Sequence, residues 1–161
     1  SFAGRLENEN NPEFFLEIAK EFSENNKNTV FNIFGDGPML KDLKKKYETK
    51  NIIFHGWVAK KFIYKITNLI VITSPLNNFP YVALEAKSYG VPTLSISDGG
   101  IKEIIKNNND GIILESNSNY KKIKKNLMYL KNNINKFKKN CIKNRKKFNE
   151  KINYLRLIKE M

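Results

Sequence analysis

The stretch SPLNNFPYVALEAKSYGVPTL, residues 74–94, combines residue types that could bind a phosphate group and sugar hydroxyls. It follows an apolar run, has Pro80 where a helix would begin, and places Glu85 five residues later. The amino end of a helix presents free amide groups and the positive end of its dipole, which suits a diphosphate. Glu85 lies too far along this helix to cap it, so we expect its carboxylate to accept hydrogen bonds from two hydroxyls, as on a ribose. The alternative is a solvated surface glutamate.

Short apolar runs alternate with amphipathic stretches from residue 1 to residue 114. The most apolar run, NLIVITS, is typical of a buried central strand. We expect strands at residues 1–4, 29–34, 51–56, 68–74, 92–97 and 111–114, and helices at 12–22, 39–47, 60–66, 80–90 and 100–108. This alternation predicts an α/β fold, a Rossmann-like doubly wound parallel sheet of about six strands with helices on both faces.

In such a sheet, ligands bind beyond the carboxyl ends of the strands. The loops that collect there follow Gly4, Phe34, Phe54 and Thr73. One of them, GDGP, begins at Gly35, and its two glycines permit a close approach of the backbone to a ligand, although the same residues also form plain turns. The sequence contains no Gly-x-Gly-x-x-Gly fingerprint and no Walker A lysine loop, which argues against a nicotinamide dehydrogenase and a P-loop enzyme.

The composition indicates one core-forming domain and excludes several kinds of site. The chain has 161 residues, of which 40% are apolar and 12% aromatic. It contains no long apolar run and no segment typical of a signal peptide, so we expect a soluble, cytosolic protein. Cys141 and His55 are the one cysteine and the one histidine, which excludes a disulfide framework and a Cys/His metal site. We expect Cys141 to be a small apolar residue on a helix and His55 to pack in the core.

The net charge of +13 comes from the C-terminal part of the chain. Residues 1–118 hold 14 Lys/Arg and 14 Asp/Glu, whereas residues 119–161 hold 15 Lys/Arg and 2 Asp/Glu, which gives charges of 0 and +13. In the same tail, apolar residues recur three or four apart, which predicts basic amphipathic helices that pack on the preceding domain. This apolar stripe consists of Tyr120, Ile123, Leu127, Leu130, Ile134, Phe137, Cys141, Phe148 and Leu155.

The opposite face of the tail carries lysines, including Lys121, Lys125, Lys139 and Lys146. Basic amphipathic helices favour anionic membrane surfaces, so a membrane is one possible partner. A nucleic acid is the lesser alternative, because the tail lacks interleaved aromatic residues and a known nucleic-acid-binding motif.

Five segments, in this order and spacing, resemble the C-terminal, donor-binding half of the retaining GT-B glycosyltransferases called glycosyltransferases group 1, or family 4. The segments are AGRLENENNPEFFLEIAKEF, FNIFGDGPML, IIFHGWV, SPLNNFPYVALEAKSYGVPTL and SDGGIKEIIKNNNDGIIL. The resemblance implies transfer of a sugar, with retention, from a nucleotide diphosphate-sugar, with UDP the expected nucleotide, to a glycan or lipid-linked acceptor in surface polysaccharide biosynthesis. We expect no cofactor or metal to be required, and we expect a cytoplasmic enzyme that its basic tail can hold at the inner face of the cell membrane.

The resemblance further implies that residues 1–118 form the donor-binding domain, with the helices of residues 119–161 packed on it. The acceptor-binding domain of the family is a separate N-terminal half. We therefore expect residues 1–161 alone to bind a nucleotide diphosphate but to transfer no sugar.

The resemblance assigns roles to individual residues. Arg5 corresponds to the arginine that grips the donor diphosphate, and the backbone at Trp57 and Val58 corresponds to the stretch that meets the base. Glu85 corresponds to the second glutamate of a Glu-x7-Glu motif, which binds the ribose, and Gly35 lies in the glycine loop of the cleft. The helix start that holds the phosphates consists of Asn78, Phe79, Pro80 and Tyr81.

Two positions depart from the family pattern. Asn77 stands where the first glutamate of the motif meets the donor sugar, and Asn10 stands where a lysine shares the diphosphate. An amide can still bind a sugar hydroxyl, so Asn77 is compatible with a different donor sugar, whereas Asn10 cannot offset phosphate charge. We therefore keep Arg5 and Asn77 as the candidate catalytic residues and a catalytically degenerate nucleotide-sugar-binding module as the alternative.

Overall fold

The computed structural model describes residues 1–77 and 80–145. Its strands are β1 (Phe2–Ala3), β2 (Phe31–Phe34), β3 (Ile52–Gly56), β4 (Ile70–Ile72), β5 (Leu76–Asn77), β6 (Thr93–Ile96), β7 (Asp98–Gly99) and β8 (Gly111–Leu114). Its helices are a 3-10 turn η1 (Asn8–Asn10), α1 (Pro12–Asn25), α2 (Leu40–Tyr47), α3 (Lys60–Ile66), α4 (Tyr81–Ser88), α5 (Ile101–Ile104), α6 (Tyr120–Asn132) and α7 (Ile134–Asn144).

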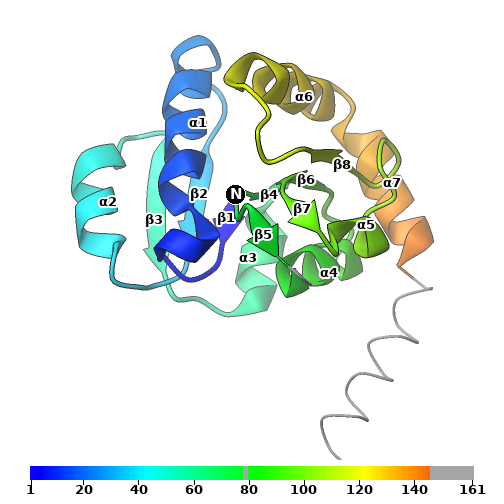
Figure 1. The fold of residues 1–161 in the computed structure, drawn as a ribbon, viewed down its shortest axis with the longest axis horizontal. Helices are drawn as coiled ribbons and strands as arrows, with labels where there is room; N and C mark the ends of the chain where they lie inside the picture. Colours follow the sequence, from blue (N-terminus) through cyan, green and yellow to red (C-terminus); the bar gives the residue numbers. More distant parts are fainter. Residues whose placement is uncertain (78–79, 146–161) are drawn as a thin grey trace, which may run out of the picture.

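The strands pair in parallel, in the orders β1-β2-β3 and β4-β6-β8. The two groups meet at β1 and β4, where the Val71 amide donates to the Ser1 carbonyl at 2.9 Å and the Ser1 nitrogen donates to the Leu69 carbonyl at 2.7 Å. Figure 1 shows β1 and β4 meeting at the centre, with α1 and α2 beside the first group and α4 to α7 around the second. The predicted α/β class with parallel strands and flanking helices is confirmed.

The sheet differs from the prediction in its continuity. We expected one sheet of about six strands, but the strands form two three-stranded ladders and a two-stranded pair. The break falls at β1, which is only two residues long and so presents few backbone groups to β4. The additional pair joins β5 to β7, with Leu76 opposite Asp98. Each of these strands is only two residues long, too short to show a periodicity, so the sequence pattern predicts loops at both places.

The predicted helix at residues 100–108 was too long. Helix α5 ends at Ile104, and the chain then turns through Asn108, which has a positive φ of 58°. The turn is held by Asp110, whose Oδ1 accepts a hydrogen bond from the Lys106 amide at 2.8 Å. A local side-chain acceptor of this kind competes with continuation of a helix.

Helices α6 and α7 bury apolar side chains against the domain. The buried residues are Ile123, Leu127 and Leu130 on α6 and Phe137 and Cys141 on α7. Tyr120 and Ile134 are half-buried. The last two members of the predicted stripe, Phe148 and Leu155, lie outside the described residues, as does Lys146.

A buried ion pair that was not predicted from the sequence links α4 to the residue before β8, and a hydrogen bond from α7 joins the same carboxylate. Lys87 on α4 contacts Asp110 at 2.7 Å, and their side chains are 6% and 1% exposed. The Lys87 ammonium also donates to the Ile104 carbonyl at 2.6 Å, and Asn144 on α7 donates to Asp110 Oδ2 at 2.8 Å. The buried ammonium and carboxylate neutralise each other and are hydrogen-bonded, so the network can hold α4 in a fixed position although both charges are shielded from solvent.

Within residues 1–77 and 80–145, none of the helices has the length and apolarity needed to cross a membrane.

Candidate functional site

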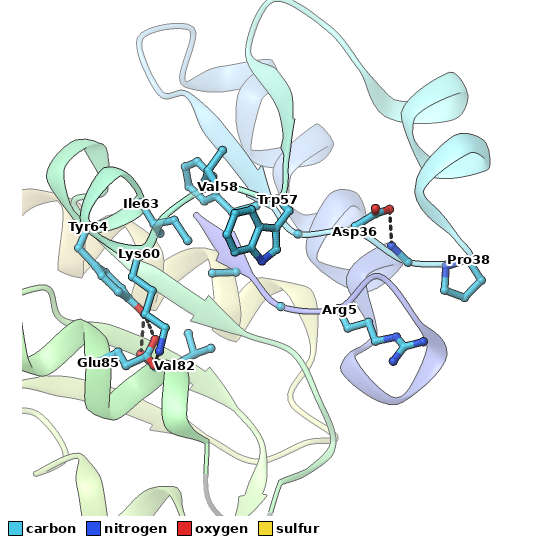
Figure 2. Close-up of a pocket in the computed structure, with 15 residues that line it drawn as sticks. Arg5, Asp36, Pro38, Trp57, Val58, Lys60, Ile63, Tyr64, Val82 and Glu85 are labelled. Carbon is cyan, nitrogen blue, oxygen red and sulfur yellow. Dashed lines mark hydrogen bonds and ion pairs between the residues drawn. The ribbon is translucent and has the colours of Figure 1, made fainter. Parts of the chain in front are cut away.

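A cleft of about 640 Å³ opens beyond the carboxyl ends of β1, β2 and β3. Figure 2 shows the side chains that line it, which come from the loops after these strands and from helices α3 and α4. The chain segments that line it are Ala3–Arg5, Phe34–Pro38 and Trp57–Val58, together with Lys60, Ile63 and Tyr64 of α3 and Val82 and Glu85 of α4. The cleft therefore brings together five of the residues selected from the sequence, namely Arg5, Gly35, Trp57, Val58 and Glu85.

The loops after β1 and β2 are joined backbone to backbone. The Gly4 amide donates to the Phe34 carbonyl at 3.0 Å, and the Leu6 amide donates to the Asp36 carbonyl at 2.9 Å. A Cβ on Gly35 would lie 1.9 Å from the Gly4 carbonyl oxygen, and Gly35 has a φ of 134°. The glycine is therefore required by the contact between the two loops, and its predicted approach to a ligand stays a prediction.

The loop after β3 places an aromatic ring at the mouth of the cleft. The side chain of Trp57 is 82% exposed, although the residue lines the cleft. Two residues before it, His55 stacks on Phe34 with ring centroids 4.7 Å apart, and its Nε2 lies 2.8 Å from the side-chain Oδ1 of Asn32. Burial lowers the pKa of His55. We predicted that His55 packs in the core, but the residue is only half-buried: its ring stacks on the buried Phe34 at the edge of the core.

Glu85 lies at the centre of a polar cluster with Lys60 and Tyr64 (Figure 2). The Lys60 ammonium pairs with Glu85 Oε1, and the Tyr64 hydroxyl donates to Glu85 Oε2 at 3.1 Å. Tyr64 is buried and stacks on Tyr89 with ring centroids 4.9 Å apart, and burial raises its pKa far above the usual value. The carboxylate is thus oriented by a rigid neutral donor and neutralised by a flexible cation.

Arg5 lies at the edge of the cleft, and its guanidinium is turned toward the loop of η1 (Figure 2). Its Nε lies 3.0 Å from Glu7 Oε2, and its side chain is 69% exposed. Asn10 donates from Nδ2 to the Arg5 carbonyl at 2.9 Å. The Asn10 amide therefore supports the loop that carries Arg5.

A second cavity of about 300 Å³ adjoins the cleft, because Ala3, Gly4, Arg5 and Val82 line both. Its other walls include Asn10, Ser74, Pro80 and Tyr81. Pro80 is the N-cap of α4, one position before its first helical residue, whereas we predicted that the helix begins at Pro80 itself. The cavity therefore lies against the amino end of α4.

Three of the predicted residues lie wholly or partly outside the described part of the chain. The backbone of Asn77 belongs to β5 and pairs with Gly99, but its side chain is not among the described ones. Asn78 and Phe79 lie outside the described residues.

Sequence reasoning missed Lys60 and Tyr64. They stand four residues apart in KKFIYKI, so they share one face of α3. The face that meets α4 could not be identified from the sequence, because the contact depends on how α3 and α4 pack across β4.

Relatives of known description match most of the chain. The family model named Glycosyl transferases group 1 matches residues 1–148. An Escherichia coli UDP-Gal:α-D-GlcNAc-diphosphoundecaprenol α-1,3-galactosyltransferase is 35% identical over 125 residues, which is 73% of this chain and 32% of the relative. A Campylobacter jejuni α-1,4-N-acetyl-D-galactosaminyltransferase that acts on an undecaprenol-linked glycan is 30% identical over 150 residues, 90% of this chain and 41% of the relative. The chain thus spans about a third of the first relative's length.

Solved structures share the fold. The C-terminal domain of a group 1 glycosyltransferase from Francisella tularensis superposes with a TM-score of 0.74 at 24% identity, covering 87% of this chain and 80% of that domain. A pneumococcal O-GlcNAc transferase, solved with UDP and GlcNAc, superposes with a TM-score of 0.78 at 19% identity, covering 91% of this chain and 32% of that one. The chain shares its fold with the C-terminal domain of a group 1 glycosyltransferase, and it belongs to the group 1 glycosyltransferases.

Proposed function

We propose that this chain holds the nucleotide diphosphate-sugar of a retaining hexosyltransferase, and that the nucleotide is UDP. The observation that carries the proposal is the convergence of Glu85, the Arg5 loop and the Trp57–Val58 loop on one cleft. The galactosyltransferase relative is named for a UDP-sugar donor, and both relatives above are named for undecaprenol-linked glycan substrates, which supports UDP and a lipid-linked acceptor.

In this proposal, the Glu85 carboxylate accepts hydrogen bonds from the ribose hydroxyls. Each carboxylate oxygen can accept two hydrogen bonds, and one position is taken by Lys60 on Oε1 and one by Tyr64 on Oε2. The remaining positions are available to the two ribose hydroxyls. The base then lies against the backbone of Trp57 and Val58, which line the same cleft.

The diphosphate extends from the ribose toward Arg5 and the amino end of α4. The adjoining cavity beside Pro80 and Tyr81 gives it room there. When the bond between the sugar and the diphosphate breaks, negative charge grows on the leaving oxygen. A guanidinium and the helix dipole stabilise that charge more strongly in the transition state than in the ground state, so no metal or other cofactor is needed for this role. Asn77 is the residue we assign to the donor sugar.

The acceptor and the second wall of the active site belong to a separate N-terminal domain in this proposal. We therefore expect residues 1–161 to bind the donor without transferring its sugar, because transfer requires a donor enclosed between two domains. The acceptor is a glycan or lipid-linked glycan of surface polysaccharide biosynthesis. Lys121, Lys125 and Lys139 are exposed on α6 and α7, and a basic surface of this kind would favour the anionic inner face of the cell membrane.

One observation favours a second candidate, a donor-binding module without catalysis. Asn10 is neutral, and its amide is engaged by the Arg5 carbonyl and by Glu7 at 3.5 Å. It therefore supplies no charge to a diphosphate. Sugar transfer by a chain that also contains the acceptor domain would exclude this candidate.

Calorimetric titration of UDP, GDP and ADP into the 161-residue protein tests the proposal. Each nucleotide is measured once with a chelator and once with Mg²⁺. We expect saturable binding, tightest for UDP, with an affinity that the chelator leaves within about twofold. Failure of all three nucleotides to bind contradicts the proposal, and binding that depends on Mg²⁺ contradicts its metal-free form.

A further inference from the structure

Lys60, the cation that pairs with Glu85, is a candidate ligand for the phosphates of the donor. Lys60 is the first residue of α3, and its side chain is 68% exposed. It lines the cleft, and its ammonium pairs with Glu85 Oε1. Tyr64, one turn later, holds the other oxygen of the same carboxylate at 3.1 Å.

The two partners of Glu85 differ in how firmly they are held. Tyr64 is buried, stacked on Tyr89, and its hydroxyl lies 3.4 Å from the Val82 carbonyl as well as 3.1 Å from the carboxylate. Lys60 ends in a flexible stem, and an ion pair between side chains as exposed as these contributes little to stability. Loss of Lys60 from Glu85 would therefore leave the carboxylate oriented by Tyr64.

The charges around the cleft favour the release of Lys60 from Glu85 when a diphosphate binds. Among the described residues, the charged side chains that line the cleft are Arg5, Lys60, Asp36 and Glu85, two cations and two anions that sum to zero. Arg5 pairs with Glu7 and Lys60 pairs with Glu85. A diphosphate brings at least two negative charges into this neutral cleft, so its binding favours any cation that can leave a carboxylate.

We propose that Lys60 is a donor-binding residue that exchanges Glu85 for the phosphates when the ribose hydroxyls occupy the carboxylate. This inference rests on the proposed function. Val82, one turn before Glu85 toward the amino end of α4, lines both the cleft and the adjoining cavity. The cleft that holds the Lys60 ammonium therefore adjoins the cavity assigned to the phosphates, and the flexible lysine stem permits a shift toward it. Lys60 would supply the second positive charge that Asn10 cannot.

Titration of uridine, UMP and UDP into wild-type protein and two variants tests the exchange. Lys60→Gln removes the cation, and Lys61→Gln is the matched control, because Lys61 is the next residue of α3, is exposed, and is not among the residues that line the cleft. We expect Lys60→Gln to weaken UDP binding by about fivefold to tenfold and UMP by less, since an exposed cation is lost from a charged ligand. Uridine binding should stay the same, because Tyr64 still orients Glu85 and the ribose hydroxyls use acceptor positions that Lys60 does not occupy. Lys61→Gln should change each affinity by less than about twofold.

Two results would overturn the inference. An equal loss of affinity for uridine and UDP in Lys60→Gln would mean that Lys60 only orients Glu85. Unchanged UDP binding would mean that Lys60 is not a phosphate ligand. Lys60→Arg keeps the charge and should retain UDP binding within about threefold, which separates loss of charge from loss of fold. If the wild-type protein binds none of the three compounds, the proposed function fails, and this inference fails with it.

Discussion

The substitution Glu85→Gln tests the assignment of the ribose site. Glutamine keeps the size and one carbonyl oxygen of the side chain but removes its charge. A hydrogen bond to a charged acceptor contributes about 1.5–3 kcal/mol, and one between neutral groups about 0.5–1.5 kcal/mol. The substitution changes each hydrogen bond from the charged to the neutral kind. Because the Glu85 side chain is 28% exposed, we take the lower part of the difference between the two ranges for the two ribose hydroxyls. The expected loss of UDP binding is about 1–2 kcal/mol, or roughly fivefold to thirtyfold.

The assay is calorimetric titration of UDP and 2′-deoxy-UDP into the wild type and Glu85→Gln. In the wild type, removal of the 2′-hydroxyl should weaken binding by about 1 kcal/mol, and in the variant this difference should shrink by half or more. Glu17→Gln, at an exposed position on α1, is the control and should alter neither ligand. If Glu85→Gln weakens UDP and 2′-deoxy-UDP by the same factor, the carboxylate does not contact the 2′-hydroxyl and the ribose assignment is wrong.

Four further predictions concern the supporting structure and the tail. Tyr64→Phe should weaken UDP binding by about threefold to tenfold, because the tyrosine hydroxyl orients the Glu85 carboxylate. Lys60→Gln, in contrast, should leave uridine binding intact. Unchanged UDP affinity in Tyr64→Phe would contradict the positioning role of Tyr64. Asp110→Asn removes a carboxylate charge that pairs with the buried Lys87 ammonium and should lower the free energy of unfolding in urea by about 3 kcal/mol; a change below about 1 kcal/mol would refute this account of the pair. Burial raises the pKa of Cys141 to about 12, so the native protein should react with a thiol reagent at pH 8 far more slowly than the unfolded chain, and its stability should decline as pH rises from about 9 to 12, since only the unfolded thiol ionises there. Replacing Lys121 and Lys125 with Gln should change stability by less than about 0.5 kcal/mol yet reduce co-sedimentation with anionic vesicles at low salt; equal losses of vesicle and duplex DNA binding would indicate nonspecific attraction to polyanions.

The sequence predicted the strands and the loops of the cleft because each depends on local pattern. The apolar runs at β2, β3, β4, β6 and β8 lie close to their predicted positions, and Trp57 and Glu85 line the cleft as the resemblance implied. Such features follow from residue periodicity and from the rule that parallel strands end on one edge.

The features that the sequence did not predict depend on contacts between distant segments. Lys87 and Asp110 are 23 positions apart, and only the packing of α4 against the start of β8 makes them a buried pair. The partner of Glu85 is Lys60 on α3, which local pattern cannot identify. Gly35 lines the cleft, and the need for a glycine there, because a Cβ would collide with the Gly4 carbonyl, depends on a contact between two loops that local pattern does not reveal.

The most direct test of the central claim is an amide NMR titration with UDP that follows the indole of Trp57. The sequence contains one tryptophan, so the spectrum holds one indole resonance, and that ring lies exposed at the mouth of the cleft. The account predicts a saturable shift of this resonance together with the backbone amides of Gly35 and Val58, and loss of all three shifts in Glu85→Ala at the same UDP concentration. UDP binding that moves resonances elsewhere and leaves these three unchanged would contradict it.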